Sequence, residues 1–205
     1  MAQRNTFAHF LHDAGLAAWF GGSLNGAIGI NGAAADVDDP RQRARVANAG
    51  WARWTPVNAV AIGAHLIGGA QLLKENKSRV ATQQDVLRQT NIKMALTAAA
   101  LAATAYSRVL GKKMQNAGDV PVAGGTDSLS TTPHDVQQAQ KQLKILQWVI
   151  PALTAGILLS SDIHEELQRP TEVAKGTVLG LPSAIGSAVT GTVGAAGSAI
   201  RDAVH

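Results

Sequence analysis

Four side chains that can bind a metal or move protons flank the first and last apolar segments of this 205-residue chain. His12 and Asp13 precede the first apolar segment, and Asp162 and His164 follow the last one. Neutral imidazoles and carboxylates are ligands for a divalent metal and can relay protons. In an antiparallel bundle of four helices the two pairs lie on one face, which makes them a candidate metal site. Their spacing lacks the specificity of an HExxH motif, and a polar cap at the helix ends is the simpler interpretation.

A lone histidine, His65, stands near the middle of the apolar segment 56–73. A charged imidazolium is costly in lipid, and a neutral one needs hydrogen-bond partners. We expect a structural histidine that is bonded to a neighbouring helix, with ligation of a haem cofactor as the alternative. A second axial histidine is missing, because His164 would lie about 15 Å away in depth at about 1.5 Å of rise per residue.

The first apolar segment carries a row of small residues. Gly22 and Gly26 form a GxxxG motif, and Gly29 continues the row on a neighbouring face. Absent side chains let two helix backbones approach closely. We expect this row to pack inside the bundle, and a seam between two copies of the chain is the alternative.

Several classes of function lack their motifs. The sequence holds no Walker A loop, GxSxG elbow, HExxH motif or kinase signature, and it has no cysteine. The net charge is +4, from 18 Lys and Arg against 14 Asp and Glu, and the basic residues flank apolar segments without forming a long block. We therefore expect no enzymatic activity and no nucleic-acid partner, but contact with a lipid bilayer.

Four charge-poor segments supply the elements that would position these residues. A membrane-spanning helix needs about 20 mostly apolar residues. Charged residues make up 16% of the chain, below the roughly 25% of soluble proteins, and tryptophans stand within or beside the segment ends, as at a membrane boundary. The sequence predicts an all-α membrane protein, an antiparallel bundle of about four transmembrane helices, with a soluble Ala-rich bundle as the alternative. The predicted spans are 14–35, 56–73, 93–110 and 145–161.

The chain divides by composition into a transmembrane domain, 1–169, and a tail, 170–205. Within the domain, the Gly- and Ser-rich segment 112–132 is predicted to be a flexible loop, after which Thr132 is the predicted N-cap and Pro133 the first residue of the last helix. The tail is rich in Gly, Ala and Ser, and its apolar residues recur mostly every four positions, which predicts an amphipathic segment. Small residues before Asp36 fit a signal-peptide cleavage site, but the apolar stretch is too long, so we expect it to be retained.

These features favour a non-enzymatic scaffold or accessory subunit of the bacterial inner membrane. Its partners would be the bilayer and, through the Gly-rich helices, itself or another membrane protein. The alternative is a membrane protein that binds a small lipophilic ligand, a haem or a divalent metal. That site would use either His65 or the face formed by His12, Asp13, Asp162 and His164.

Overall fold

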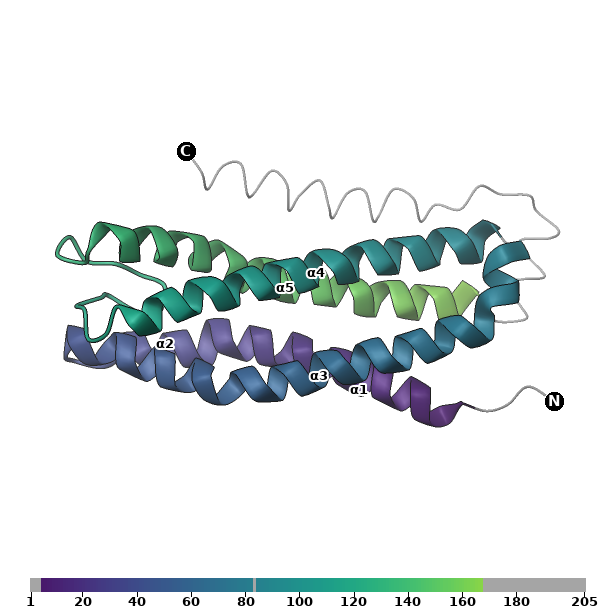
Figure 1. Cartoon of the computed structure of the whole chain (residues 1–205), viewed down its shortest axis with the longest axis horizontal. Helices are drawn as coiled ribbons and strands as arrows, with labels where there is room; N and C mark the ends of the chain where they lie inside the picture. The colour runs from purple at the N-terminus through teal and green to yellow at the C-terminus, as the bar shows by residue number, and fades with distance from the viewer. Residues whose placement is uncertain (1–4, 83, 168–205) are drawn as a thin grey trace. The chain divides into compact units, whose positions relative to one another are not determined.

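The chain folds into long helices that run back and forth beside one another (Figure 1). The computed structural model describes residues 5–82 and 84–167, without side chains at 78, 79, 81, 82, 85 and 162–167. The chain divides into two compact units after Ser161, and the helical bundle is the first of them. The predicted tail, 170–205, lies outside the described residues. The helices are α1 (Thr6–Asn25), the π-helical turn η1 (Gly26–Ile30), α2 (Asn31–Ala35), α3 (Pro40–Thr82), α4 (Gln84–Asn116) and α5 (His134–Leu167).

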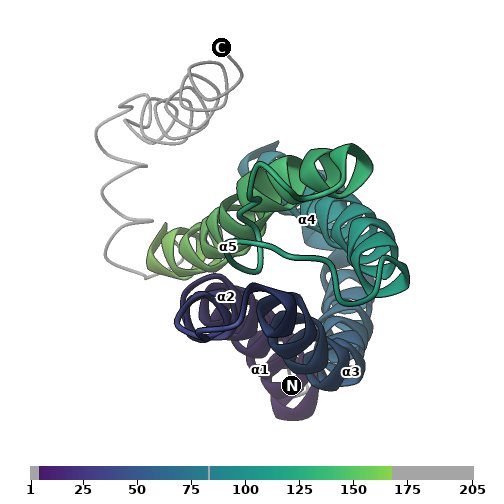
Figure 2. The same ribbon diagram turned by 90° about the vertical axis from the view of Figure 1, so that its left-hand side faces the viewer.

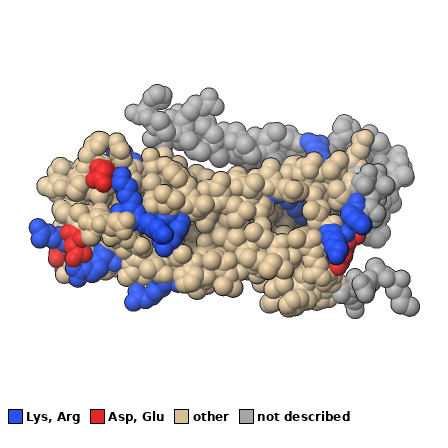
Figure 3. Space-filling view, in the orientation of Figure 1, with Lys and Arg blue, Asp and Glu red and all other residues tan. Residues whose placement is uncertain are grey.

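Among the described residues, three helical stretches are long and apolar enough to cross a membrane: Pro40–Lys77, Val86–Asn116 and His134–Ser161. Only 17%, 11% and 28% of the residues in their most apolar windows are buried, so most of these residues are at least partly exposed on the surface of the bundle. In Figure 3, charged residues gather toward the two ends of the visible face, and its middle carries none. An apolar outer surface of this kind suits lipid and is a liability in water. The described chain is therefore all-helical, with three candidate membrane-spanning helices.

The first predicted span, 14–35, is not one of these three stretches. The α-helix there gives way to the π turn at Gly26 and resumes at Asn31. Frequent glycine, together with Asn25 and Asn31, keeps the hydropathy of this region below that of the most apolar windows of the other helices. Length and hydropathy therefore do not confirm a count of four spans.

The remaining helices are longer than their predicted spans. α3 begins at Pro40 and α4 ends at Asn116, well outside the predicted limits of 56–73 and 93–110. The added turns are rich in Ala, Arg, Lys and Gln, which favour helix whether or not lipid surrounds them. Hydropathy marks the apolar centre of such a helix and misses its polar ends.

The segment 112–132, predicted as a flexible loop, is partly helical, because α4 continues to Asn116. The rest passes over the middle of the ring of helices at one end of the bundle (Figure 2). The Gln140 side chain of α5 donates hydrogen bonds to the carbonyls of Gly124 and Asp127, at 3.0 and 3.1 Å. The loop is thus fixed to the helix that follows it.

Thr132 does not cap α5, contrary to the prediction. Its hydroxyl donates to the Pro121 carbonyl at 2.6 Å and accepts from the Leu129 backbone nitrogen at 2.9 Å. The helix starts at His134, and the Pro133 carbonyl accepts its first backbone bonds. The threonine is buried and braces the loop from inside.

The apolar core joins helices that are distant in sequence. One cluster contains Leu16 and Trp19 of α1, Ala100 of α4, and Ile150 and Ile157 of α5. A second cluster lies at the end closed by the loop, and its buried members are Leu110, Met114, Val136 and Ala139. The first cluster packs α4 and α5 against α1, and the second packs α4 against α5.

Candidate functional site

Two glycines bring the backbones of α1 and α3 together. A Cβ atom at Gly15 would lie 2.6 Å from the backbone nitrogen of His65. A Cβ atom at Gly68 would lie 2.6 Å from the backbone nitrogen of His12. Because these neighbours are backbone atoms, no larger residue fits at either position without separating the helices.

His12 and His65 face each other at this crossing. Their rings stack with centroids 4.1 Å apart and planes 20° from parallel. Each Nδ1 lies 3.0 Å from the backbone carbonyl oxygen of the other histidine. Since a carbonyl oxygen only accepts, both Nδ1 atoms carry a proton, and in a neutral ring the Nε2 atom then keeps a lone pair. Stacked imidazolium ions would repel each other where His65 is only 2% exposed, so the geometry favours two neutral rings.

The crossing has a local two-fold symmetry that can be read in the sequence. Both helices carry the pattern Ala-x-x-x-His-x-x-Gly, at residues 8–15 and 61–68. The carbonyl oxygens of Ala8 and Ala61 are the atoms that the opposing glycines approach. The sequence analysis considers His12 and His65 separately, and this shared pattern is the signal that links them.

Trp19 connects the histidine pair to α4. It is fully buried, and its ring lies edge-on to that of His65 at 6.2 Å between centroids. Its Nε1 donates a hydrogen bond to Thr104 Oγ1 of α4 at 3.2 Å. The pair is therefore joined to the bundle through one aromatic side chain.

The other predicted ligands have different surroundings. Asp13 is exposed on α1, and the side chains of Asp162 and His164 lie outside the described residues. In the part of the chain that the structure describes, no three His, Cys, Asp or Glu side chains gather closely enough to hold a metal. A metal at His12, Asp13, Asp162 and His164, and a haem on His65, both stay predictions.

The glycines of the GxxxG motif face aromatic rings of α3. A Cβ atom at Gly22 would overlap the indole of Trp54, and one at Gly26 would overlap that of Trp51. Gly29 lies elsewhere, with Asn25 Oδ1 of its own helix 2.6 Å from its ideal Cβ position. The row Gly22–Gly26 thus packs against the indoles of Trp54 and Trp51 of the same chain.

The bundle holds a partly open cavity of about 440 Å³ beneath the loop. Its wall combines the indoles of Trp51 and Trp54 with polar groups, among them Asn58, Ser107 and Arg108. Arg108 is the one charged residue in the part of the wall that the structure describes. This cavity was not predicted, because its lining comes from separate helices and from the loop.

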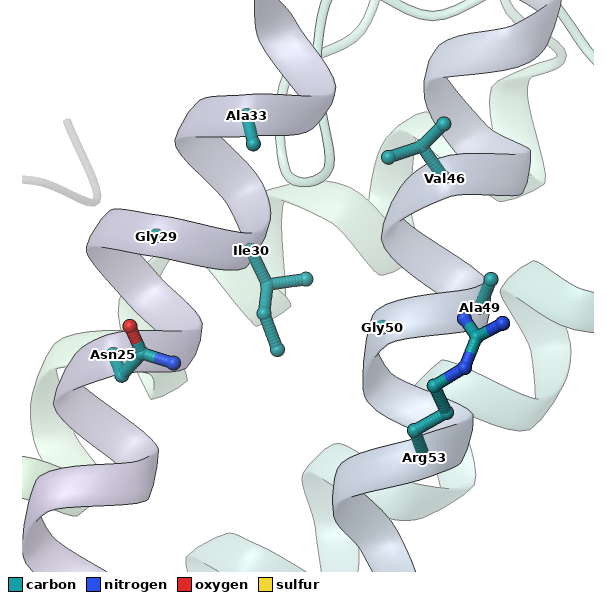
Figure 4. A pocket seen from close by; sticks show the side chains of 8 residues that line it. All are labelled: Asn25, Gly29, Ile30, Ala33, Val46, Ala49, Gly50 and Arg53. Carbon is teal, nitrogen blue, oxygen red and sulfur yellow. The ribbon is translucent and has the colours of Figure 1, made fainter.

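A second pocket, of about 430 Å³, opens outward between the π turn and α3. Figure 4 shows Ile30 and Val46 pointing into the space between the two helices, and Arg53 extending beside Ala49. The wall is otherwise formed by small residues. Its complete lining is Asn25, Gly29, Ile30, Ala33, Val46, Ala49, Gly50 and Arg53.

Three comparisons with known proteins identify no relative of this chain. Neither the family models, nor the curated proteins, nor the solved structures contain a match to this chain.

Proposed function

We propose that this chain is an integral membrane protein with four passes, which acts without catalysis as a scaffold or accessory subunit. The observation that carries the proposal is the outer surface of the helix at 6–35. Its large apolar residues Phe7, Phe10 and Ile28 are 68%, 63% and 59% exposed. Within the charge-free stretch 14–35, Ser23 and Asn31 are buried and Asn25 is the exposed polar residue. A largely apolar outer surface without charges suits lipid.

The mean hydropathy underestimates how apolar the lipid-facing side of this helix is, because the average includes residues that pack against other helices. Gly15 and His12 lie against α3, and Asn31 accepts a hydrogen bond from Trp51 Nε1 at 3.0 Å. Asn31 also donates to Gln147 Oε1 of α5 at 2.8 Å. At about 1.5 Å per residue, 30 residues span about 45 Å, enough to cross a bilayer.

The scaffold role is supported by the packing surfaces. Small residues bring α1 and α3 together, and large apolar residues remain on the outside, available to lipid or to another membrane protein. The Gly- and Ala-rich segment 170–205 would provide a further amphipathic surface. The Ala-rich composition is typical of a high-GC bacterium, and the inner membrane is the site we propose.

Cysteine labelling distinguishes four passes from three, since the natural chain has no cysteine. In a four-pass protein, Thr6→Cys reacts with an impermeant maleimide from one side of the membrane. Asp38→Cys and Ser128→Cys react from the opposite side. The measurement is labelling of intact spheroplasts compared with lysed ones, in the full chain.

The unsubstituted protein is the blank, and lysed cells show that each cysteine is reactive. If α1 does not cross, Thr6→Cys and Asp38→Cys react from the same side. That result would reject the fourth pass and leave three.

A further inference from the structure

We propose that the cavity beneath the loop binds an organic anion with an apolar body, a carboxylate being the simplest case. The cavity lies between α3, α4 and α5, Ser23 of α1 and Asn31 of α2 add to its wall, and Gly125 and Thr126 of the loop line one end. Its volume of about 440 Å³ falls within the roughly 300–1,000 Å³ of small-molecule sites. It is too small for a lipid with two acyl chains.

Arg108 is the reason why the proposed ligand carries a negative charge. It lies within the candidate membrane-spanning stretch of α4 and is partly buried. It makes no hydrogen bond or ion pair with any residue that the structure describes. A guanidinium that is partly withdrawn from water and has no partner carries a desolvation cost, and an anion offsets that cost through two parallel hydrogen bonds. A single cation in the wall matches a ligand with a single negative charge.

Two buried polar atoms in the same wall also lack partners. Asn58 Oδ1 and Ser107 Oγ are inaccessible to solvent and form no hydrogen bond with the described residues. Buried polar groups are nearly always hydrogen-bonded, and a rotation of either side chain toward the cavity would let a polar ligand supply the missing bond. Ser107 adjoins Arg108 in sequence, and its hydroxyl can donate to the same carboxylate.

The remaining wall suits an apolar body. Trp51 and Trp54 line the cavity together with Ile62, Leu101 and Ile150. The Trp51 indole nitrogen already donates to Asn31 at 3.0 Å, so this ring offers the ligand its carbon surface. Such a ligand can be a single-chain lipid from the bilayer or an aromatic acid from water, and both have the same carboxylate chemistry.

The test is a binding titration of the full chain in nanodiscs of zwitterionic lipid, followed by tryptophan fluorescence. The probes are decanoate and 1-naphthoate, with decanol and naphthalene as neutral counterparts and empty nanodiscs as the blank. We expect saturable binding of at least one acid, at least tenfold tighter than that of its neutral counterpart. Preference for decanoate indicates a membrane source of the ligand, and preference for 1-naphthoate indicates a soluble one.

Three variants locate the site. Arg108→Gln should weaken acid binding at least tenfold, whereas Arg41→Gln, at an exposed arginine outside the cavity, should leave it unchanged. Gly111→Leu adds a bulky side chain to the cavity wall at a position where a Cβ meets no atom within 4 Å, and it should abolish binding. Melting temperatures without ligand show that each variant folds.

Equal binding of acids and neutral compounds would overturn the proposal, as would unchanged binding in either Arg108→Gln or Gly111→Leu. If Arg108→Gln does not fold, Gly111→Leu together with the acid-to-neutral ratio decides the outcome. None of these results depends on the number of passes, so failure here is distinct from failure of the four-pass proposal.

Discussion

The paired histidines are the residues whose chemistry depends most on their immediate neighbours. We expect His12→Ala and His65→Ala each to lower the free energy of unfolding by about 1–3 kcal/mol, because each removes a hydrogen bond and half of a stacked pair. The double variant should cost less than the sum by at least about 0.5 kcal/mol, since the stacking contact is lost only once. Thermal unfolding of the four proteins in one detergent measures this cycle. Strict additivity would mean that the rings do not interact.

Asp119 gives a prediction about pH. The Arg45 side chain donates two hydrogen bonds to its carboxylate, and these bonds hold the pKa of Asp119 below its usual value. A lowered pKa means that the pair stabilises the fold fully above the ordinary aspartate pKa of about 3.9. This stabilisation is lost as the pH falls through the lower pKa of the folded state.

The natural protein and Asp119→Asn should therefore differ in melting temperature by a constant amount near neutral pH and converge in acid. The difference should be small and should shrink in high salt, because both side chains are exposed. The measurement is melting temperature against pH at two salt concentrations. A difference that persists in strong acid would show that the pair is not the cause.

The elements α1 and α3 depend on glycine at specific positions. Gly15→Ala should lower the free energy of unfolding by about 1–3 kcal/mol, because its Cβ would meet backbone atoms of α3. Gly21→Ala is the matched control on the same helix, since its Cβ meets nothing within 4 Å. That change should stabilise the helix by up to about 1 kcal/mol. Thermal unfolding of the two variants tests the close approach, and equal effects would contradict it.

The sequence predicts the helices better than it predicts how they face one another. Long runs without charge are enough to locate the centres of α3, α4 and α5, because length and hydropathy are local properties. The pairing of His12 with His65 is not local, since it depends on the antiparallel alignment of two helices. In the sequence, only the repeated Ala-x-x-x-His-x-x-Gly pattern indicates that the two histidines pair.

For the whole molecule, the outward apolar surface predicts firm membrane association. The full chain should stay in the pellet after an alkaline carbonate wash and should leave it only in detergent. Carbonate releases proteins held by charge, but not helices that are buried in lipid. The measurement is the fraction of protein in each step by immunoblot. Recovery of most of the chain in the wash would favour a soluble Ala-rich bundle.

The cavity shows where prediction from sequence ends. Asn58 and Arg108 are separated by 50 positions, and Gly125 and Gln147 come from still later parts of the chain. Their spacing in the sequence does not indicate that these residues line the same cavity. Their meeting depends on the bundle's topology and on a loop whose hydrogen bonds to Gln140 form only after folding.

The π turn at Gly26–Ile30 determines how the two interior sites are oriented relative to each other. A π turn holds one residue more than an α turn, and one residue corresponds to a rotation of about 100° about the helix axis. Deleting the codon for Gly29 would restore a plain α-helix, so that His12 and Asn31 would no longer both face the interior. Either the histidine crossing or the hydrogen bonds from Asn31 to the cavity wall would be lost. The one extra residue of the π turn thus lets His12 and Asn31, at opposite ends of the helix at 6–35, both face the interior of the bundle.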